Sequence, residues 1–163
     1  LPGIPLHHYH ITKGTTPGIF PLAIRFEADC IRGTAVAEVA AALNAKGYVP
    51  DLILGHVGWG ETLSLPEIWP EARTLIYAEL FVRSQGLDFG FDPEFPAGNL
   101  GNAMRVRAKN AGVLMALIQA DRGLAPTAFQ RDTFPAALRE RIAVCHDGID
   151  TDEVRPRKDA RFT

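Results

Sequence analysis

The feature that most limits the possible folds of this chain is a set of short apolar runs that do not alternate with polar residues. They are Leu52–Gly55, Thr74–Ala78 and Ile142–Cys145, with Gly123–Ala125 as a shorter fourth. Unalternating runs of this length are typical of strands buried on both faces. Because helical stretches lie between them, the pattern predicts βαβ units and a mostly parallel sheet with helices on both sides. The predicted fold class is α/β.

One long helix is predicted from about Pro21 to Lys46, since proline suits the first turn of a helix. Gly47 stands where a helix ends in the left-handed conformation. Apolar residues recur at helical spacing. They are Val36, Val39, Ala40 and Leu43.

A second long helix is predicted over Gly101–Ala120, with Asn110 away from its buried face. A shorter helix is expected to begin near Thr127, a good N-cap residue, and Leu6–Ile11 is expected to be extended. The expected buried face of the second helix consists of Met104, Ala108, Ala111, Met115 and Ile118.

The composition narrows the class of protein. The 163 residues correspond to one domain, and a hydrophobic content of 47% supports a real core. A net charge of −2 removes the electrostatic argument for nucleic acid as a partner. No run approaches the roughly 20 apolar residues of a membrane-spanning helix. Cys30 and Cys145 lie in apolar segments and are expected to be buried and inert, which favours a reducing cytoplasm.

The loop after the first predicted strand is the strongest candidate for a binding site, since ligands bind at the carboxyl ends of parallel strands. It begins at His56 and continues as Gly58-Trp59-Gly60-Glu61. The two glycines would let the backbone approach a ligand, the indole would stack on a sugar ring, and the carboxylate would accept hydroxyl hydrogen bonds. A tight turn with Trp59 packed inward explains the same residues equally well.

Further acids follow the second predicted strand. Glu79 has the apolar neighbours Leu80 and Phe81, and a carboxylate there is costly unless it is paired or functional. The alternative is an acid satisfied by backbone amides at a helix start. Asp92 and Glu94 lie in an aromatic, proline-containing loop that suits either a flap over a substrate or a packed surface loop.

The histidines raise the question of a metal. His7, His8 and His10 could on paper join His56 and Glu61 in a zinc site. However, the chain has no H-x-x-x-H pair and no cysteine pair at ligand spacing, so no metal site is predicted. It also has no Walker loop, no G-x-G-x-x-G and no G-x-S-x-G.

Several of these segments, in this order, resemble family 4 glycosyltransferases of the GT-B type. A "G-x-x-P-D-hydrophobic" run that leads to a histidine is followed by segments similar to one subgroup of that family, and Val144–Asp150 resembles the "N-G-V-D" turn with aspartate for asparagine. The other matching segments are Gly47–His56, Gly58–Leu63, Tyr77–Phe81, Gly90–Phe95 and Ala120–Thr127.

The resemblance implies two Rossmann-like, three-layer domains that face a cleft. The N-terminal domain mainly binds the acceptor and the C-terminal domain binds the nucleotide-sugar. Residues 1–153 would form most of the N-terminal domain, and 154–163 would begin the interdomain linker. The family's opening strand and glycine turn would precede Leu1, and the donor-binding domain would follow Thr163, so the chain alone is expected to be inactive.

The resemblance also implies an activity. A hexose would pass from a nucleotide-sugar to a sugar or lipid-linked acceptor, with retention and without a metal or other cofactor. Glu79 stands where many relatives carry a histidine near the reacting sugar, and is the expected catalytic residue. The expected location is the cytoplasm, including the inner membrane surface. The expected substrate-binding residues are His56, Gly58, Trp59, Gly60, Glu61, Asp92 and Glu94.

Two other functions fit an α/β chain of this kind. A stand-alone module that binds sugars or small molecules would hold a complete sheet and bind its ligand without a partner domain. A metal-dependent hydrolase built on the histidines would contain stoichiometric zinc.

Overall fold

The four predicted strands form one parallel sheet. A computed structural model describes residues 3–87, 89–95, 98–156 and 161. The strands lie in chain order, β1-β2-β3-β4, and His56 pairs with Tyr77 while Tyr77 pairs with Leu124. The predicted α/β class with parallel strands is thereby confirmed. The strands are β1 (Leu52–His56), β2 (Arg73–Tyr77), β3 (Arg122–Ala125) and β4 (Ile142–Val144).

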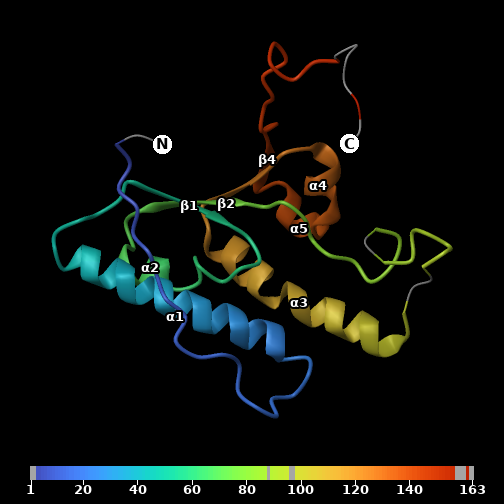
Figure 1. The fold of residues 1–163 in the computed structure, drawn as a ribbon, viewed down its shortest axis with the longest axis horizontal. Helices are drawn as coiled ribbons and strands as arrows, with labels where there is room; N and C mark the ends of the chain where they lie inside the picture. Colours follow the sequence, from blue (N-terminus) through green and yellow to red (C-terminus); the bar gives the residue numbers. More distant parts are fainter. Residues whose placement is uncertain (1–2, 88, 96–97, 157–160, 162–163) are drawn as a thin grey trace.

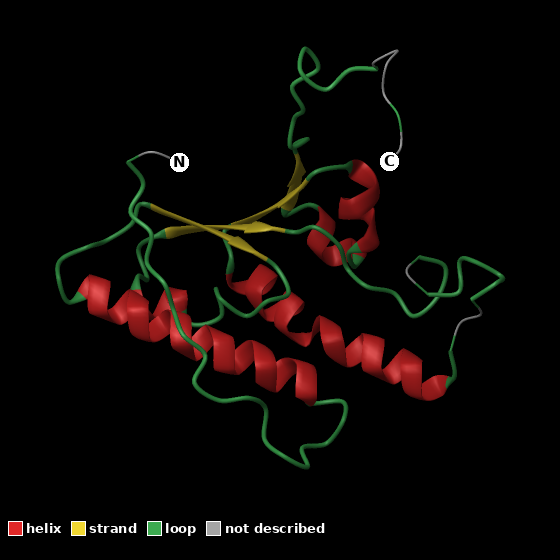
Figure 2. Ribbon diagram, viewed as in Figure 1, coloured by secondary structure: helices red, strands yellow, loops and turns green. Residues whose placement is uncertain are grey.

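The first helix precedes the sheet and the others connect its strands. Helices were predicted on both sides of the sheet, but both long helices lie on the same side (Figures 1 and 2). Figures 1 and 2 show α1, α2 and α3 beneath the sheet, whereas α4 and α5 lie near β4. The helices are α1 (Ile24–Asn44), α2 (Leu65–Ile68), α3 (Leu100–Gln119), α4 (Ala128–Thr133) and α5 (Ala136–Arg139).

The helix ends agree with the local sequence signals. Gly47 has a φ of +85°, and its amide donates to Asn44 O at 2.8 Å, so the chain leaves α1 as predicted. Thr127 caps α4 by accepting a hydrogen bond from the Gln130 amide at 3.2 Å. Both helices are therefore confirmed, with α1 three residues shorter at its start than Pro21 indicated.

The core has two parts. The first part lies where β2 and β3 pack against α3. Its fully buried residues include Ile76, Leu117 and Phe134, the last of which follows α4. A second cluster joins β1 to α1 and α2 around Ile53 and Trp69, and the Trp69 indole donates to Tyr48 O at 3.1 Å. The two clusters hold α1 and α3 against the same face of the sheet.

The prediction that β1 is buried on both faces is wrong. Ile53 is buried against the helices, but its neighbours Leu52 and Leu54 are 55% and 63% exposed. Successive side chains of a strand point to opposite faces. In the described part of the chain, no helix covers the face of β1 that carries Leu52 and Leu54.

The predicted buried face of α3 is also wrong. Met104, Met115 and Ile118 are exposed, whereas Val106, Val113 and Leu117 are buried. Asn110, expected on an outer face, is 4% exposed, and its Nδ2 donates to Val82 O at 2.8 Å. The helix is rich in alanine and apolar residues on several sides, so its spacing alone does not specify which side packs.

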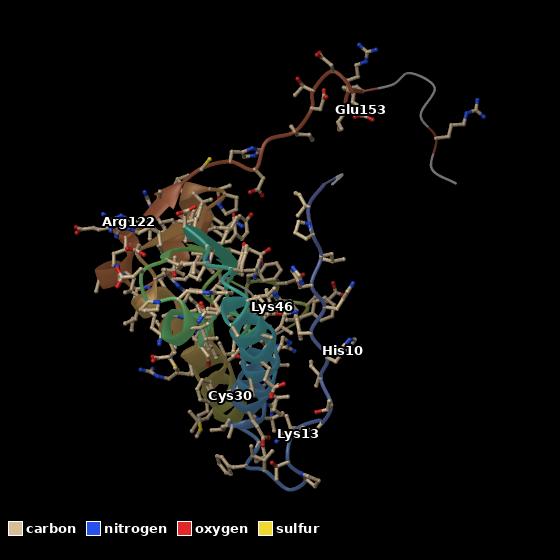
Figure 3. The ribbon with its side chains drawn as sticks, turned by 90° about the vertical axis from the view of Figure 1, so that its left-hand side faces the viewer. His10, Lys13, Cys30, Lys46, Arg122 and Glu153 are labelled. Atoms are coloured by element: carbon tan, nitrogen blue, oxygen red, sulfur yellow. The ribbon has the colours of Figure 1, made fainter. Side chains whose placement is uncertain are left out.

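Two smaller predictions fail as well. Leu6–Ile11 forms no strand but runs as an irregular segment beside α1, where Figure 3 labels His10 and Lys13. Cys30 and Cys145 are exposed rather than buried, because Cys30 lies on the solvent side of α1 and Cys145 follows the end of β4. Partial burial, with the nearby carboxylates of Asp29 and Glu27, raises the pKa of the Cys30 thiol.

Among the residues that the structure describes, no helix is long and apolar enough to cross a membrane. Part of the expected linker, residues 157–160 and 162–163, lies outside the described residues. The boundary expected near residue 153 stays a prediction.

Candidate substrate-binding site at the carboxyl edge of the sheet

The carboxyl ends of β1 and β2 place two aromatic side chains next to each other. His56 is the last residue of β1 and Tyr77 the last of β2, and the two are register partners. Their ring centroids are 5.5 Å apart. Parallel strands that end at the same level therefore place two aromatic rings side by side at this edge.

His56 and Glu79 form a pair at this edge. His56 Nε2 lies 3.2 Å from Glu79 Oε2, and His56 Nδ1 lies 2.6 Å from Val57 O. A carbonyl oxygen only accepts, so Nδ1 carries a proton, and a hydrogen bond to Glu79 requires a second proton on Nε2 or on the carboxyl group. Both side chains are about half exposed. The pair is thus accessible to a ligand.

Tyr77 is joined to Asp147, which follows β4. The Tyr77 hydroxyl donates to the Asp147 carboxylate, with distances of 3.0 and 2.8 Å to its two oxygens. This hydrogen bond, together with partial burial and the negative charges of Asp147 and Glu79, raises the pKa of Tyr77. The motif pattern singles out neither residue for function, although both follow or end strands at the edge where ligands bind.

Trp59 lies beside this group and is not packed inward. It is 48% exposed, and its ring centroid is 6.4 Å from that of His56. The guanidinium groups of Arg25 and Arg32, both from α1, lie over the indole at 5.3 and 5.7 Å. The expected alternative of a buried tryptophan is therefore wrong, and cation–π contacts hold the ring at the surface.

The two glycines around Trp59 adopt the left-handed conformation, with φ of +88° at Gly58 and +90° at Gly60. A Cβ on Gly60 would lie 2.2 Å from Asp29 O. Gly60 is thus required for the close approach of the loop to α1, rather than for a backbone approach to a ligand. Its neighbour Glu61 accepts a hydrogen bond from the Tyr9 hydroxyl at 3.0 Å.

The predicted site residues divide into two groups. His56, Trp59 and Glu79 come together at the ends of β1 and β2, whereas Glu61, on the same loop as Trp59, bonds to Tyr9. Asp92 and Glu94 lie on the loop before α3, which extends away from the sheet in Figure 1, and Asp92 accepts a hydrogen bond from the Glu94 amide at 2.9 Å. The structure therefore does not join these two acids to His56.

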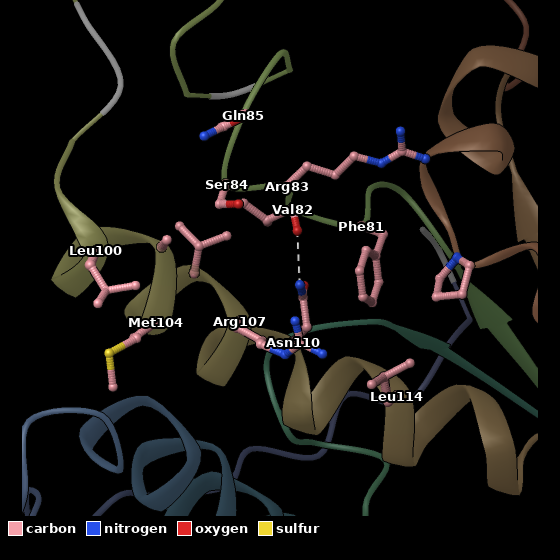
Figure 4. A pocket seen from close by; sticks show the side chains of 13 residues that line it. Phe81, Val82, Arg83, Ser84, Gln85, Leu100, Met104, Arg107, Asn110 and Leu114 are labelled. Atoms are coloured by element: carbon pink, nitrogen blue, oxygen red, sulfur yellow. Dashed lines mark hydrogen bonds between the residues drawn. The ribbon is translucent and has the colours of Figure 1, made fainter.

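A groove of about 660 Å³ lies next to the site, between α3 and the chain that follows Glu79. Figure 4 shows Phe81, Leu100, Met104 and Leu114 around it, and the hydrogen bond from Asn110 to Val82 O joins two further lining residues. Its size and largely apolar lining suit the apolar part of a small ligand.

The histidines do not assemble a metal centre in the described residues. No group of three or more histidine, cysteine, aspartate or glutamate side chains lies close enough there to hold an ion. His7, His8 and His10 are exposed on the irregular N-terminal segment, apart from His56. The hydrolase alternative thus gains no support from the geometry.

Comparison with known proteins identifies the class. A family model described as "glycosyl transferase family 4 group" matches residues 1–154, which is most of the chain. The chain therefore belongs to this glycosyltransferase group, as the order of its motifs indicated. Comparisons with curated proteins and with solved structures return no match.

Proposed function

We propose that this chain is the acceptor-side part of a glycosyltransferase that transfers a hexose from a nucleotide-sugar to an acceptor hydroxyl. The observation that carries the proposal is the accessible His56–Glu79 pair, 3.2 Å apart, beside the half-exposed Trp59 at the carboxyl edge of a parallel sheet. Membership of the glycosyl transferase family 4 group supports the general activity.

The transfer requires only a few chemical steps at the carboxyl edge of the sheet. The bond between the sugar C1 and the phosphate oxygen breaks, and the nucleoside diphosphate leaves with the electron pair. The acceptor oxygen bonds to C1 and loses its proton, and the proposed stereochemical outcome is retention. Glu79 would bind a hydroxyl group of the reacting sugar, or receive the acceptor proton with His56 as its partner. Trp59 would contact the sugar or the acceptor.

The remaining parts of the proposal concern substrates and partners. A second domain would hold most of the donor diphosphate, and no metal or other cofactor is required. The acceptor would be a sugar or a lipid-linked sugar, whose apolar part the groove beside Phe81 and Leu114 would accommodate (Figure 4). The cytoplasmic location, including the inner membrane surface, stays a prediction.

The role of Glu79 is tested by Glu79→Gln in the full-length parent protein. We expect turnover to fall by about 100-fold or more, since general acid–base groups commonly contribute that much. Glu71→Gln is the matched control, because Glu71 is an exposed glutamate in the turn before β2, at the opposite edge of the sheet. Near-wild-type turnover in Glu79→Gln would remove Glu79 from the mechanism.

The substrate class is tested by a panel of nucleotide-sugars, with thermal shift and slow donor hydrolysis measured without added metal. A nucleotide-sugar that stabilises the parent protein but not residues 1–163 supports a site divided between two domains. Equal stabilisation of residues 1–163, or no response to any nucleotide-sugar, would instead favour a stand-alone binding module.

A further inference from the structure

Asp29 is a buried charged residue that the proposed chemistry does not use. It lies in the second turn of α1 and is only 1% exposed. Its cationic neighbours are Arg25, with Nε 3.2 Å from Oδ1, and Arg32, with Nη1 3.5 Å from Oδ1. Burial raises the pKa of Asp29 above its ordinary value, although the charges of the two arginines oppose this shift. A buried carboxylate is costly unless it is paired, and Arg25 and Arg32 are the partners that offset this cost.

Both arginines continue from Asp29 to the loop at the site. They lie four residues before and three residues after Asp29, and therefore on the same side of α1. Arg25 donates to Gly58 O and Arg32 donates to Trp59 O. The same two guanidinium groups lie over the Trp59 ring. One carboxylate thus orients two cations, and each cation holds both a carbonyl group and the indole.

The space around Asp29 is closed on two sides by glycines. A Cβ on Gly60 would lie 2.2 Å from Asp29 O, and a Cβ on Gly112 of α3 would lie 2.7 Å from Asp29 Oδ2. On the same helix, a Cβ on Gly33 would lie 2.6 Å from Gly60 O. The loop, α1 and α3 therefore meet at Asp29 without intervening side chains, so its carboxylate has little freedom to change position.

We propose that Asp29 is a positioning residue, which acts through Arg25 and Arg32 to set the orientation of Trp59 at the substrate-binding edge. The consequence for catalysis rests on the proposed function, because it assumes that Trp59 contacts substrate. The predicted effect of Asp29 on the orientation of Trp59 does not depend on the proposed function. A residue that merely stabilised α1 would change the free energy of unfolding and leave the environment of Trp59 in the folded state unchanged.

The test uses the full-length parent protein labelled with 5-fluorotryptophan, and observes the ¹⁹F signals of Trp59 and Trp69. Each signal is assigned by its disappearance on substitution of that tryptophan by phenylalanine. In Asp29→Asn, which keeps the shape and removes the charge, we expect the Trp59 signal to shift or broaden. The Trp69 signal should stay in place, because that indole is held by Tyr48 O in the other core cluster. Glu38→Gln, an exposed acid on the same helix, is the matched control.

A second variant covers the case in which Asp29→Asn does not fold. Arg25→Lys combined with Arg32→Lys keeps the positive charges but removes the planar guanidinium groups, and should also move the Trp59 signal. An unchanged Trp59 signal in a folded Asp29→Asn protein would overturn the proposal, as would an unchanged signal in the double lysine variant.

Measurements of activity distinguish a failure of this inference from a failure of the proposed function. If the parent protein hydrolyses a nucleotide-sugar or transfers its sugar, Asp29→Asn should lower kcat/KM roughly 10- to 100-fold. A fall of this size is expected when a binding group is misplaced. A shifted Trp59 signal in a protein that is active on no nucleotide-sugar would refute the proposed function and support the positioning role.

Discussion

The two edges of the sheet use polar residues in different ways. At the amino edge, Asp121 accepts hydrogen bonds from the Thr74 amide and from Arg73 Nη1, both at 2.8 Å, while its own amide donates to Thr74 O at 3.0 Å. These bonds join the adjacent strands β2 and β3. At the carboxyl edge, His56 bonds to Glu79 and to Val57 O, and both side chains are about half exposed, as that of Asp121 is.

The difference between the two edges indicates which of them binds a ligand. At the amino edge the Asp121 carboxylate is bound by the Thr74 amide and by Arg73, both on the adjacent strand, so its two oxygens are used to join β2 and β3. At the carboxyl edge the polar groups come from segments that follow three different strands, and Tyr77 and Asp147 are separated by 70 residues in the chain. In the part of the chain that the structure describes, this edge gathers accessible groups of mixed chemistry around an aromatic surface, as a ligand site requires.

The largest effect on stability is expected from Gly60→Ala, which tests whether the loop at the carboxyl edge must pack closely against α1. Alanine is strained at a φ of +90°, and its Cβ would overlap Asp29 O. We expect a loss of roughly 3 kcal/mol or more in the free energy of unfolding, measured in urea. Gly47→Ala is the control, because Gly47 has a φ of +85° and open space around it, and should cost about 1 kcal/mol. Equal costs for the two variants would show that the contact with Asp29 is unimportant.

A smaller, pH-dependent effect is expected from Asp121→Asn at the amino edge. The hydrogen bonds from the Thr74 amide and from Arg73, and the charges of Arg73 and Arg122, lower the pKa of Asp121. A folded-state pKa below the unfolded one stabilises the protein above the unfolded value of about 3.9, and this contribution is lost as the pH falls toward the folded value.

Asp121→Asn should therefore be less stable than wild type at pH 7, and the difference should shrink on acidification. Urea unfolding from pH 7 to pH 2.5 measures it, with Glu71→Gln as the control. A stability difference that stays constant over this range would mean that the charge of Asp121 does not contribute.

The smallest effect is expected from Tyr77→Phe, which removes one hydrogen bond at the carboxyl edge and leaves the ring beside His56. The chain after β4 should lose its attachment to β2, so amide hydrogen exchange should accelerate in residues 146–150 and stay unchanged in 52–56. Tyr48→Phe is the control, since Tyr48 is half exposed and far from Asp147 in the fold. Unchanged exchange in residues 146–150 would show that Asp147 is held by other contacts.

The local sequence was sufficient to predict most of the secondary structure. Unalternating apolar runs located the four strands of the sheet to within a residue or two. Gly47 marked the end of α1 through its left-handed backbone, and Thr127 marked the start of α4 through its side-chain cap; neither signal needs a distant partner. The general rule on parallel strands also placed His56, Trp59 and Glu79 at one edge, and the order of the motifs identified the family.

The tertiary structure alone decided which sides of the elements are buried and which distant residues meet. Asn110 looks like a surface residue in the sequence, but packing buries it, and its Nδ2 donates to Val82 O, 28 residues away in the chain. The contacts of Arg25 and Arg32 with the Gly58–Trp59 loop span 33 and 27 residues, and no local spacing encodes them. Burial and long-range pairing depend on how the helices pack on the sheet, whereas strand and turn preferences act within a few residues.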